Sequence, residues 1–162
     1  MMRKFTIAAF SGVVLLCNLL SAQETQSAKS CPAEGFTGGF SRGCPQRRLA
    51  NPSDISAMMA ALPDKAPATP QGVRHVLVLC NAPGWVHTSI PLAAKMVEYL
   101  GDKTGAWMTT ITYDPATITA ENLKQYDALF LDSTTSEFLD DPNNKAASQA
   151  RRQALLNFVK GG

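Results

Sequence analysis

Three short hydrophobic runs divide the second half of the chain. They cover residues 76–80, 107–113 and 128–131. The first is continuously apolar, which is typical of a strand covered on both faces, and the third is another short apolar run. The middle run is rich in threonine, isoleucine and aromatic residues, which favour strands. The pattern therefore predicts three strands. Their expected centres are Val78, Ile111 and Phe130.

Helical periodicity follows each of these runs. After the first run, a buried helical stripe is expected at Ile90, Ala93, Val97 and Leu100. Thr88 or Ser89 is expected to cap this helix, and Pro91 suits its first turn, where a missing N–H costs nothing. A short helix capped by Thr119 and a longer final helix complete the pattern.

The alternation of strands and helices predicts the fold class. Strand, helix, strand, short helix, strand, helix implies a parallel sheet with right-handed crossovers, which is a Rossmann-like α/β domain with flanking helices. A three-stranded parallel sheet covers its own faces poorly. We therefore expect the domain over residues 73–162 to be truncated after the third strand and the helix that follows it.

The first residues have the three-part layout of a secretory signal peptide. Arg3 and Lys4 precede an apolar run over residues 5–20, and Ala22 is a small residue at a plausible cleavage point. The alternative is a membrane anchor, which needs about 20 strongly apolar residues, and this run is shorter. Residues 1–22 are therefore expected to be removed on export, leaving a secreted or periplasmic protein without a stable membrane span.

Residues 23–72 are expected to form a leader that ends in a proline-rich linker. Cys31 and Cys44 flank a glycine-rich segment within it, and such a pair is expected to form a disulfide in an oxidising compartment. Cys80 ends the first predicted strand. A buried, inert thiol is the expectation there.

The charge balance argues against nucleic acid as a partner. The chain has 15 Lys and Arg against 13 Asp and Glu, and removal of residues 1–22 takes away Arg3 and Lys4, so the mature chain is formally neutral. A neutral chain offers no electrostatic attraction for nucleic acid or for an anionic membrane. A hydrophobic fraction of 45% fits a globular domain.

Ligands of open parallel sheets bind beyond the carboxyl ends of the strands, so the loops after the three strands are candidate sites. His87 lies in the first of these loops, just before a predicted helix. It is the candidate catalytic residue, since a histidine there could move a proton, bind a metal or hold a sugar hydroxyl. The alternative is an ordinary loop histidine that helps to cap the helix.

Five further side chains are candidates for substrate binding. They are Trp85, Ser89, Asp132, Thr134 and Thr135. The Trp85 ring could stack on a sugar, and a tryptophan anchored in the core is the alternative. The polar residues after the third strand could face the same crevice, although a turn-forming role explains them equally well.

Sequence motifs for nucleotides and activated nucleophiles are missing. No Gly-x-Gly-x-x-Gly follows the first strand, and the glycine cluster at residues 35–43 lacks the Gly-Lys-Ser/Thr ending of a phosphate loop. The chain also has no Gly-x-Ser-x-Gly elbow and no His-Glu-x-x-His run. The sequence therefore does not identify a cofactor. A divalent metal is one candidate, and no motif for a nucleotide is present.

Several segments together resemble the ThuA-like (trehalose-utilisation) domain family. The matching segments are residues 76–79, 84–90, 119–123, 126–127, 134–135 and 158–162. They occur in the family's order and at suitable spacing. The resemblance covers about residues 73–162, the front portion of such a domain.

The resemblance implies a flavodoxin-like fold, as in class I glutamine amidotransferases, and a small-molecule carbohydrate partner, including keto disaccharides. It also implies a further strand and a second histidine loop after the position of Gly161 and Gly162. Three functions compete. They are an enzyme-type domain acting on a sugar, a non-catalytic carbohydrate-binding or structural module, and an inactive fragment of a longer protein.

Overall fold

The computed structural model describes residues 40–42 and 49–162 of the chain. All of these residues belong to one of two compact units of the chain, residues 33–162. The predicted signal peptide, residues 1–22, and the predicted Cys31–Cys44 disulfide lie outside the described residues. None of the described helices is both long and apolar enough to span a membrane.

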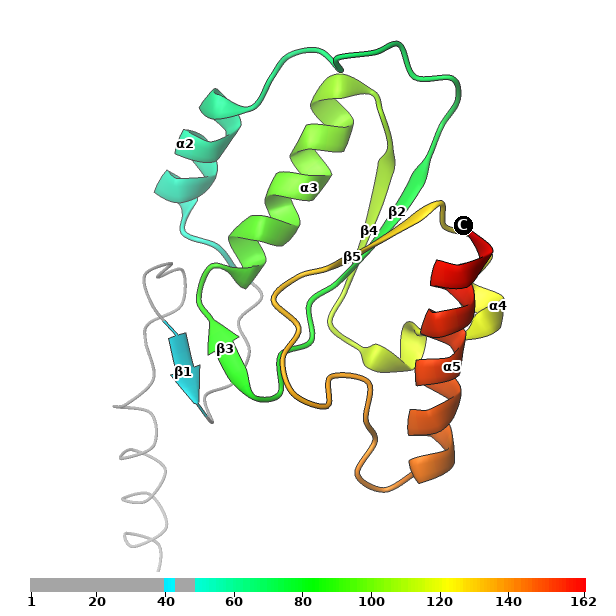
Figure 1. Cartoon of the computed structure of the whole chain (residues 1–162). Coiled ribbons are helices and arrows are strands. Elements are labelled where there is room, and N and C mark those ends of the chain that lie inside the picture. The colour runs from blue at the N-terminus through cyan, green and yellow to red at the C-terminus, as the bar shows by residue number, and fades with distance from the viewer. Residues whose placement is uncertain (1–39, 43–48) are drawn as a thin grey trace, which may run out of the picture. The chain divides into compact units, whose positions relative to one another are not determined.

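Three parallel strands form the central sheet (Figure 1). They are β2 (His75–Leu79), β4 (Met108–Thr112) and β5 (Ala128–Leu131), in the spatial order β4-β2-β5. The predicted strand centres are confirmed, since Val78 lies opposite Ile111 on one side and opposite Phe130 on the other. Together with the helices on both faces, this confirms the α/β, flavodoxin-like fold class.

Helices cover both faces of this sheet. They are α3 (Ile90–Thr104) on one face and α4 (Ala120–Leu123) with α5 (Lys145–Gly161) on the other; a short 3₁₀ helix, η1 (Pro115–Thr117), precedes α4. Alternate residues of β2 point to opposite faces. Val78 packs in the cluster beneath α3, whereas Leu77 and Leu79 pack in the cluster beneath α4 and α5. A strand covered on both sides explains why this run is continuously apolar.

The buried stripe of α3 differs from the prediction. Its fully buried residues are Ile90, Pro91, Ala94, Val97 and Gly101, whereas Ala93 and Leu100 are only half-buried. Ser89 occupies the N-cap position, one of the two predicted, but its backbone is helical and its side chain makes no capping hydrogen bond. At the other end, Gly105 terminates the helix in the left-handed conformation at φ 65°.

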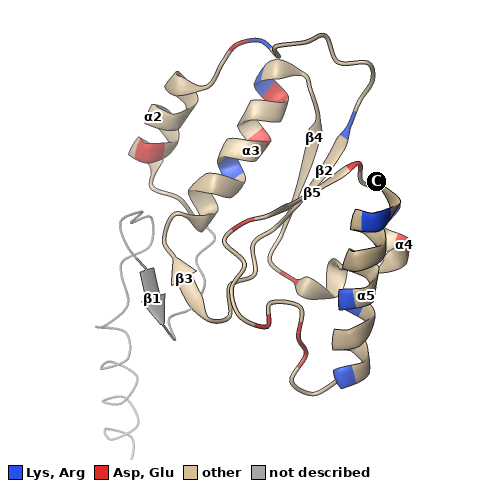
Figure 2. Cartoon of the chain, in the orientation of Figure 1, with Lys and Arg blue, Asp and Glu red and all other residues tan. Residues whose placement is uncertain are grey.

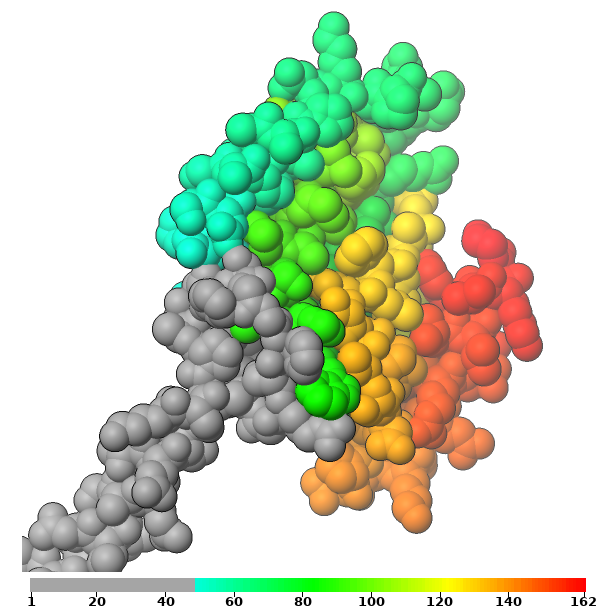
Figure 3. Space-filling view, turned by 60° about the vertical axis from the view of Figure 1, so that its left-hand side comes forward, coloured from blue at the N-terminus to red at the C-terminus, as the bar shows by residue number. Residues whose placement is uncertain are grey.

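Two elements precede the predicted domain boundary at residue 73. The strand β1 (Phe40–Arg42) pairs antiparallel with β3 (Trp85–His87), a short strand inside the predicted first loop. The helix α2 (Pro52–Ala61) lies alongside α3 (Figure 3). Lys103 of α3 ties this helix in place, since its ammonium donates to Leu62 O at 2.7 Å and pairs with Asp64 at 2.9 Å.

Candidate functional site

The carboxyl ends of the three parallel strands meet at one edge of the sheet, and their loops lie together there. Because β2, β4 and β5 run in the same direction, their last residues are held side by side by ladder bonds. Cys80 N donates to Thr112 O at 2.9 Å, and Asp132 N donates to Leu79 O at 2.9 Å. This edge is where ligands of open parallel sheets bind.

The strand β3 orients the residues of the first loop. Its exposure alternates, with Trp85 exposed, Val86 buried at 5% and His87 half-buried. Successive side chains of an extended strand point to opposite sides, so Trp85 and His87 share the side away from the Val86 core contact. Pairing of β3 with β1 holds this short segment extended.

Thr135 joins the first loop to the loop after β5. Its hydroxyl accepts a hydrogen bond from Trp85 N at 3.1 Å and donates to Trp85 O at 3.3 Å. Gly84 approaches the same loop so closely that a Cβ placed on it would overlap the Ser136 hydroxyl and lie 3.1 Å from Ser136 Cβ. The two segments that the sequence predicted to share a crevice are therefore in direct contact.

The loop after β5 has an unusual backbone. Ser133 and Ser136 both have positive φ, at 49° and 55°, which a residue with a side chain adopts at a cost. Residues held in such conformations occur where the surrounding structure enforces them, and they cluster at ligand sites and switch regions. Here Asp132 is buried before the first of these turns and Thr135 is bonded to Trp85 between them.

Beneath these loops lies a buried polar cluster that the sequence did not reveal. Cys80 Sγ donates to Asp132 Oδ2 at 3.6 Å, and Tyr113 also hydrogen-bonds the thiol. Each of the three residues directly follows one of the parallel strands, β2, β5 and β4 in that order. The side chains meet because these strands end side by side. The signal in the sequence was a polar or thiol residue at the carboxyl end of each apolar run or directly after it.

The cluster is electrically neutral under mildly acidic conditions. Burial raises the pKa of Asp132 from 3.8 to about 6, although hydrogen bonds from Cys80 and Ser133 act in the opposite direction. Burial, followed by the nearby Asp132 charge, raises the pKa of Cys80 to about 12. The thiol therefore stays protonated near neutral pH and is a poor nucleophile. The expected burial of Cys80 is confirmed, with an exposure of 0%.

The predicted substrate-binding residues lie in different environments. Trp85 and Thr135 are bonded to each other, Thr134 is half-buried, and Ser89 is exposed at the start of α3. Asp132 is only 2% exposed and faces Cys80. A ligand could reach the Asp132 carboxylate only after movement of its loop, so direct substrate binding by Asp132 stays a prediction.

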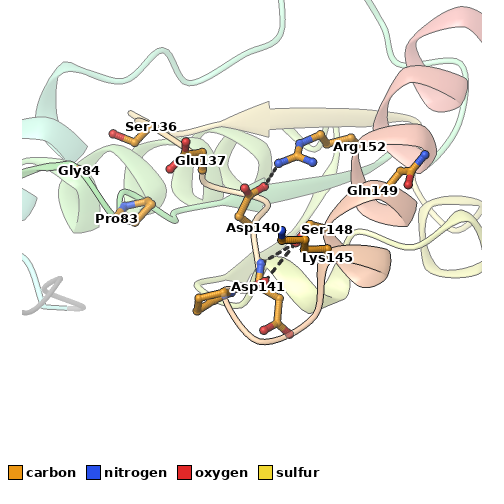
Figure 4. A pocket seen from close by; sticks show the side chains of 11 residues that line it. Pro83, Gly84, Ser136, Glu137, Asp140, Asp141, Lys145, Ser148, Gln149 and Arg152 are labelled. Carbon is orange, nitrogen blue, oxygen red and sulfur yellow. Dashed lines mark hydrogen bonds and ion pairs between the residues drawn. The ribbon is translucent and has the colours of Figure 1, made fainter.

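A cavity of about 800 Å³ lies beside this edge of the sheet (Figure 4). Its walls come from the loop after β2, the loop after β5 and the first turns of α5. The lining residues are Pro83, Gly84, Ser136, Glu137, Asp140, Asp141, Pro142, Lys145, Ser148, Gln149 and Arg152. None of the six predicted site residues is in this set, but Gly84 and Ser136 adjoin Trp85 and Thr135 in the chain.

The sequence analysis did not predict the charged residues of this cavity as site residues. The loop before α5 carries carboxylates and α5 carries lysine and arginine (Figure 2). Only the fold brings them to the lining of one cavity. Within the described part of the chain, no group of three or more His, Cys, Asp and Glu residues is placed to hold a metal ion.

The contact between the two loops can be tested with a double-mutant cycle. Gly84→Ala is expected to lower the free energy of unfolding by about 1–2 kcal/mol, because the new methyl group displaces Ser136. Adding Ser136→Gly removes the overlapping atoms and relieves the positive φ, so the double variant is expected to recover most of the loss. Urea unfolding of the four proteins measures this coupling.

Gly72→Ala is the matched control, because nothing lies within 4 Å of a Cβ at Gly72. It is expected to leave stability unchanged or to raise it slightly. Strictly additive effects of Gly84→Ala and Ser136→Gly would show that the loops are not in contact.

Comparison with known proteins identifies the family. Residues 75–161 match the family model ThuA, described as trehalose utilisation, and this range is more than half of the chain. No curated protein and no solved structure matched the chain in the corresponding searches. The matched range contains the whole central sheet, both loops of the candidate site and all of α5. The chain therefore belongs to the ThuA, or trehalose-utilisation, family.

Proposed function

We propose that this chain is an exported protein of carbohydrate utilisation that binds a sugar or keto-sugar derivative at the carboxyl edge of its parallel sheet. The observation that carries the proposal is the tie between Thr135 and Trp85, which brings two family-matched loops together at the edge where such folds bind ligands. The trehalose-utilisation family supplies the substrate class.

Trp85 and His87 are the residues best placed to meet a ligand. Trp85 is 42% exposed, and an exposed tryptophan at a ligand-binding edge is suited to contact a sugar. His87 lies on the same side of β3 and is half-buried, which suits a side chain that holds a hydroxyl or moves a proton. Thr134 and Thr135 offer hydroxyl groups from the facing loop, and Ser89 offers another from the start of α3.

Replacement of His87 tests this proposal. His87→Ala is expected to weaken binding of trehalose or its keto derivative, and any turnover, by about 10-fold or more, because a hydrogen bond to the ligand is lost. Stability is expected to fall by much less, since His87 lies outside both buried clusters. Calorimetric titration with each sugar and urea unfolding of the same preparations measure the two effects.

His75→Ala is the matched control. His75 is the only other histidine in the chain. It is exposed and lies at the amino end of β2, opposite the candidate site. Its replacement is expected to leave sugar binding unchanged. Equal losses of binding and stability in His87→Ala would instead favour a helix-capping role. Binding without turnover in the wild type would identify a binding module rather than an enzyme.

A further inference from the structure

Two of the three walls of the cavity beside the candidate site carry charged residues, and their chemistry differs (Figure 4). One wall is acidic and comes from the loop between β5 and α5. The other is the first two turns of α5, where Lys145, Ser148, Gln149 and Arg152 all line the cavity. Positions i, i+3, i+4 and i+7 lie on one side of a helix, so these residues form a continuous polar stripe. The volume of about 800 Å³ falls within the range of small-molecule sites, roughly 300–1,000 Å³.

Part of the charge in this cavity is already neutralised within the protein. Arg152 pairs with Asp140, as Figure 4 shows. Asp141 is committed to its own turn, where its carboxylate accepts from Asn143 N at 2.9 Å and its backbone N donates to Ser148 Oγ at 2.8 Å. These pairs give the wall a fixed shape.

Two charged groups in the lining are left for a ligand. The Glu137 carboxylate and the Lys145 ammonium are exposed and have no side-chain partner among the described residues. Glu137 can only accept hydrogen bonds at neutral pH and Lys145 can only donate them. Hydroxyl groups do both, so a polyhydroxyl ring can satisfy the two walls at once.

The balance of charge also selects against an anion. The lining holds three carboxylates, Glu137, Asp140 and Asp141, and the two cations Lys145 and Arg152. Arg151, behind the lining, supplies a third cation, 3.8 Å from the Asp141 carboxylate. Asp140 and Asp141 are each paired with an arginine, so the lining offers a phosphorylated or acidic sugar no surplus of positive charge. The unpaired Glu137 carboxylate would in addition repel such an anion. Like-charge juxtaposition of this kind is a common source of specificity.

We propose that this cavity is the ligand subsite for a neutral polyhydroxyl ring, with Glu137 and Lys145 as its specificity-determining residues. The inference rests on the proposed function and extends it, because it names the class of sugar and the place of one ring. Gly84 and Ser136 connect the cavity to Trp85 and Thr135. A second ring or a reacting group would extend from the cavity towards β3.

The test uses the full chain and two probes that differ by one phosphate, trehalose and trehalose 6-phosphate. Backbone amide shifts and calorimetric titration report where and how tightly each binds. We expect trehalose to shift amides of residues 136–152 and to bind about 10-fold more tightly than its phosphate. Lys145→Gln is expected to weaken trehalose binding about 10-fold. Glu137→Gln is also expected to weaken trehalose binding, and to reduce the difference in affinity between trehalose and its phosphate.

Lys160→Gln is the matched control, since Lys160 is a cation in the last turn of α5 and does not line the cavity. It is expected to change neither affinity. Trehalose binding that is lost in His87→Ala but unaffected by Lys145→Gln and Glu137→Gln would overturn the subsite and leave the proposed function standing. Tighter binding of the phosphate would overturn the neutral specificity. If neither trehalose nor trehalose 6-phosphate binds, both proposals are overturned.

Discussion

Asp132→Asn is expected to make the protein more stable than the wild type at pH 7.5 and to leave it about equally stable at pH 4. The Asp132 side chain is 2% exposed, and burial raises its pKa to about 6 in the folded protein, from 3.8. Between these two values the folded state binds more protons than the unfolded state, so stability falls as the pH rises. A shift of this size corresponds to about 3 kcal/mol.

The asparagine variant isolates this effect because it cannot ionise. Its amide oxygen can still accept the hydrogen bond from Cys80, so the loss of packing and bonding is small. Cys80 does not obscure the result, since burial raises the pKa of its thiol to about 12 and it remains neutral over the measured range. Urea unfolding of both proteins at half-unit intervals from pH 4 to pH 8 gives the difference curve. A difference that stays constant across this range would show that Asp132 does not titrate in the folded protein.

Asp127→Asn is a control of opposite sign. The backbone N–H of His75, at 2.7 Å, and the Arg74 guanidinium, at 2.9 Å, lower the pKa of Asp127 below 3.8. Such a carboxylate contributes stability above pH 3.8 that is lost as the pH falls through the folded pKa. Its replacement is therefore expected to reduce stability at neutral pH, in contrast to Asp132→Asn.

Gly101→Ala is expected to destabilise the protein by about 2–3 kcal/mol, even though alanine favours helices by about 1 kcal/mol over glycine. A Cβ on Gly101 would lie 2.6 Å from both the carbonyl O and Nε1 of Trp107. The backbone of Trp107 leads directly into β4, so it cannot move away without disturbing the sheet. The cost of overpacking therefore outweighs the gain in helix propensity. The Trp107 Nε1–H donates to Val97 O at 3.1 Å, and this bond is also expected to weaken.

Urea unfolding and tryptophan emission measure the outcome, because a displaced Trp107 changes its environment. Gly161→Ala is the matched control within a helix, since nothing lies within 4 Å of a Cβ at that position. It is expected to leave stability unchanged or slightly higher. A rise in stability for Gly101→Ala would show that α3 and the start of β4 are less closely packed than the structure indicates.

Much of the sheet followed from the sequence. The register of Val78 with Ile111 and Phe130 agrees with the predicted strand centres, and the parallel order follows from the alternation with helices. The reason is physical. A strand covered on both faces, such as β2, is apolar along its buried run. Parallel strands can be joined only by a long crossover connection, which is usually a helix. The contact between the two loops was also predictable, because parallel strands end at one edge.

Contacts between residues far apart in the sequence were determined only by the tertiary structure. Cys80 and Asp132 are 52 positions apart, and each alone looks like an ordinary strand-end residue. The shared burial is what raises the pKa of both. The buried stripe of α3 includes Ala94 and Gly101 where the sequence predicted Ala93 and Leu100. The close approach of Trp107 to Gly101 helps to determine which side of the helix faces the sheet.

The sequence by itself therefore determined the type and order of the elements in the central domain and the loops where chemistry could lie. Local periodicity records whether a position is buried, which is enough for a strand or a helix. The cavity, the β1–β3 pair and the Asp140–Arg152 pair depend on how loops pack after the sheet has formed. Those contacts join segments with no common periodicity, so only the folded chain decides them.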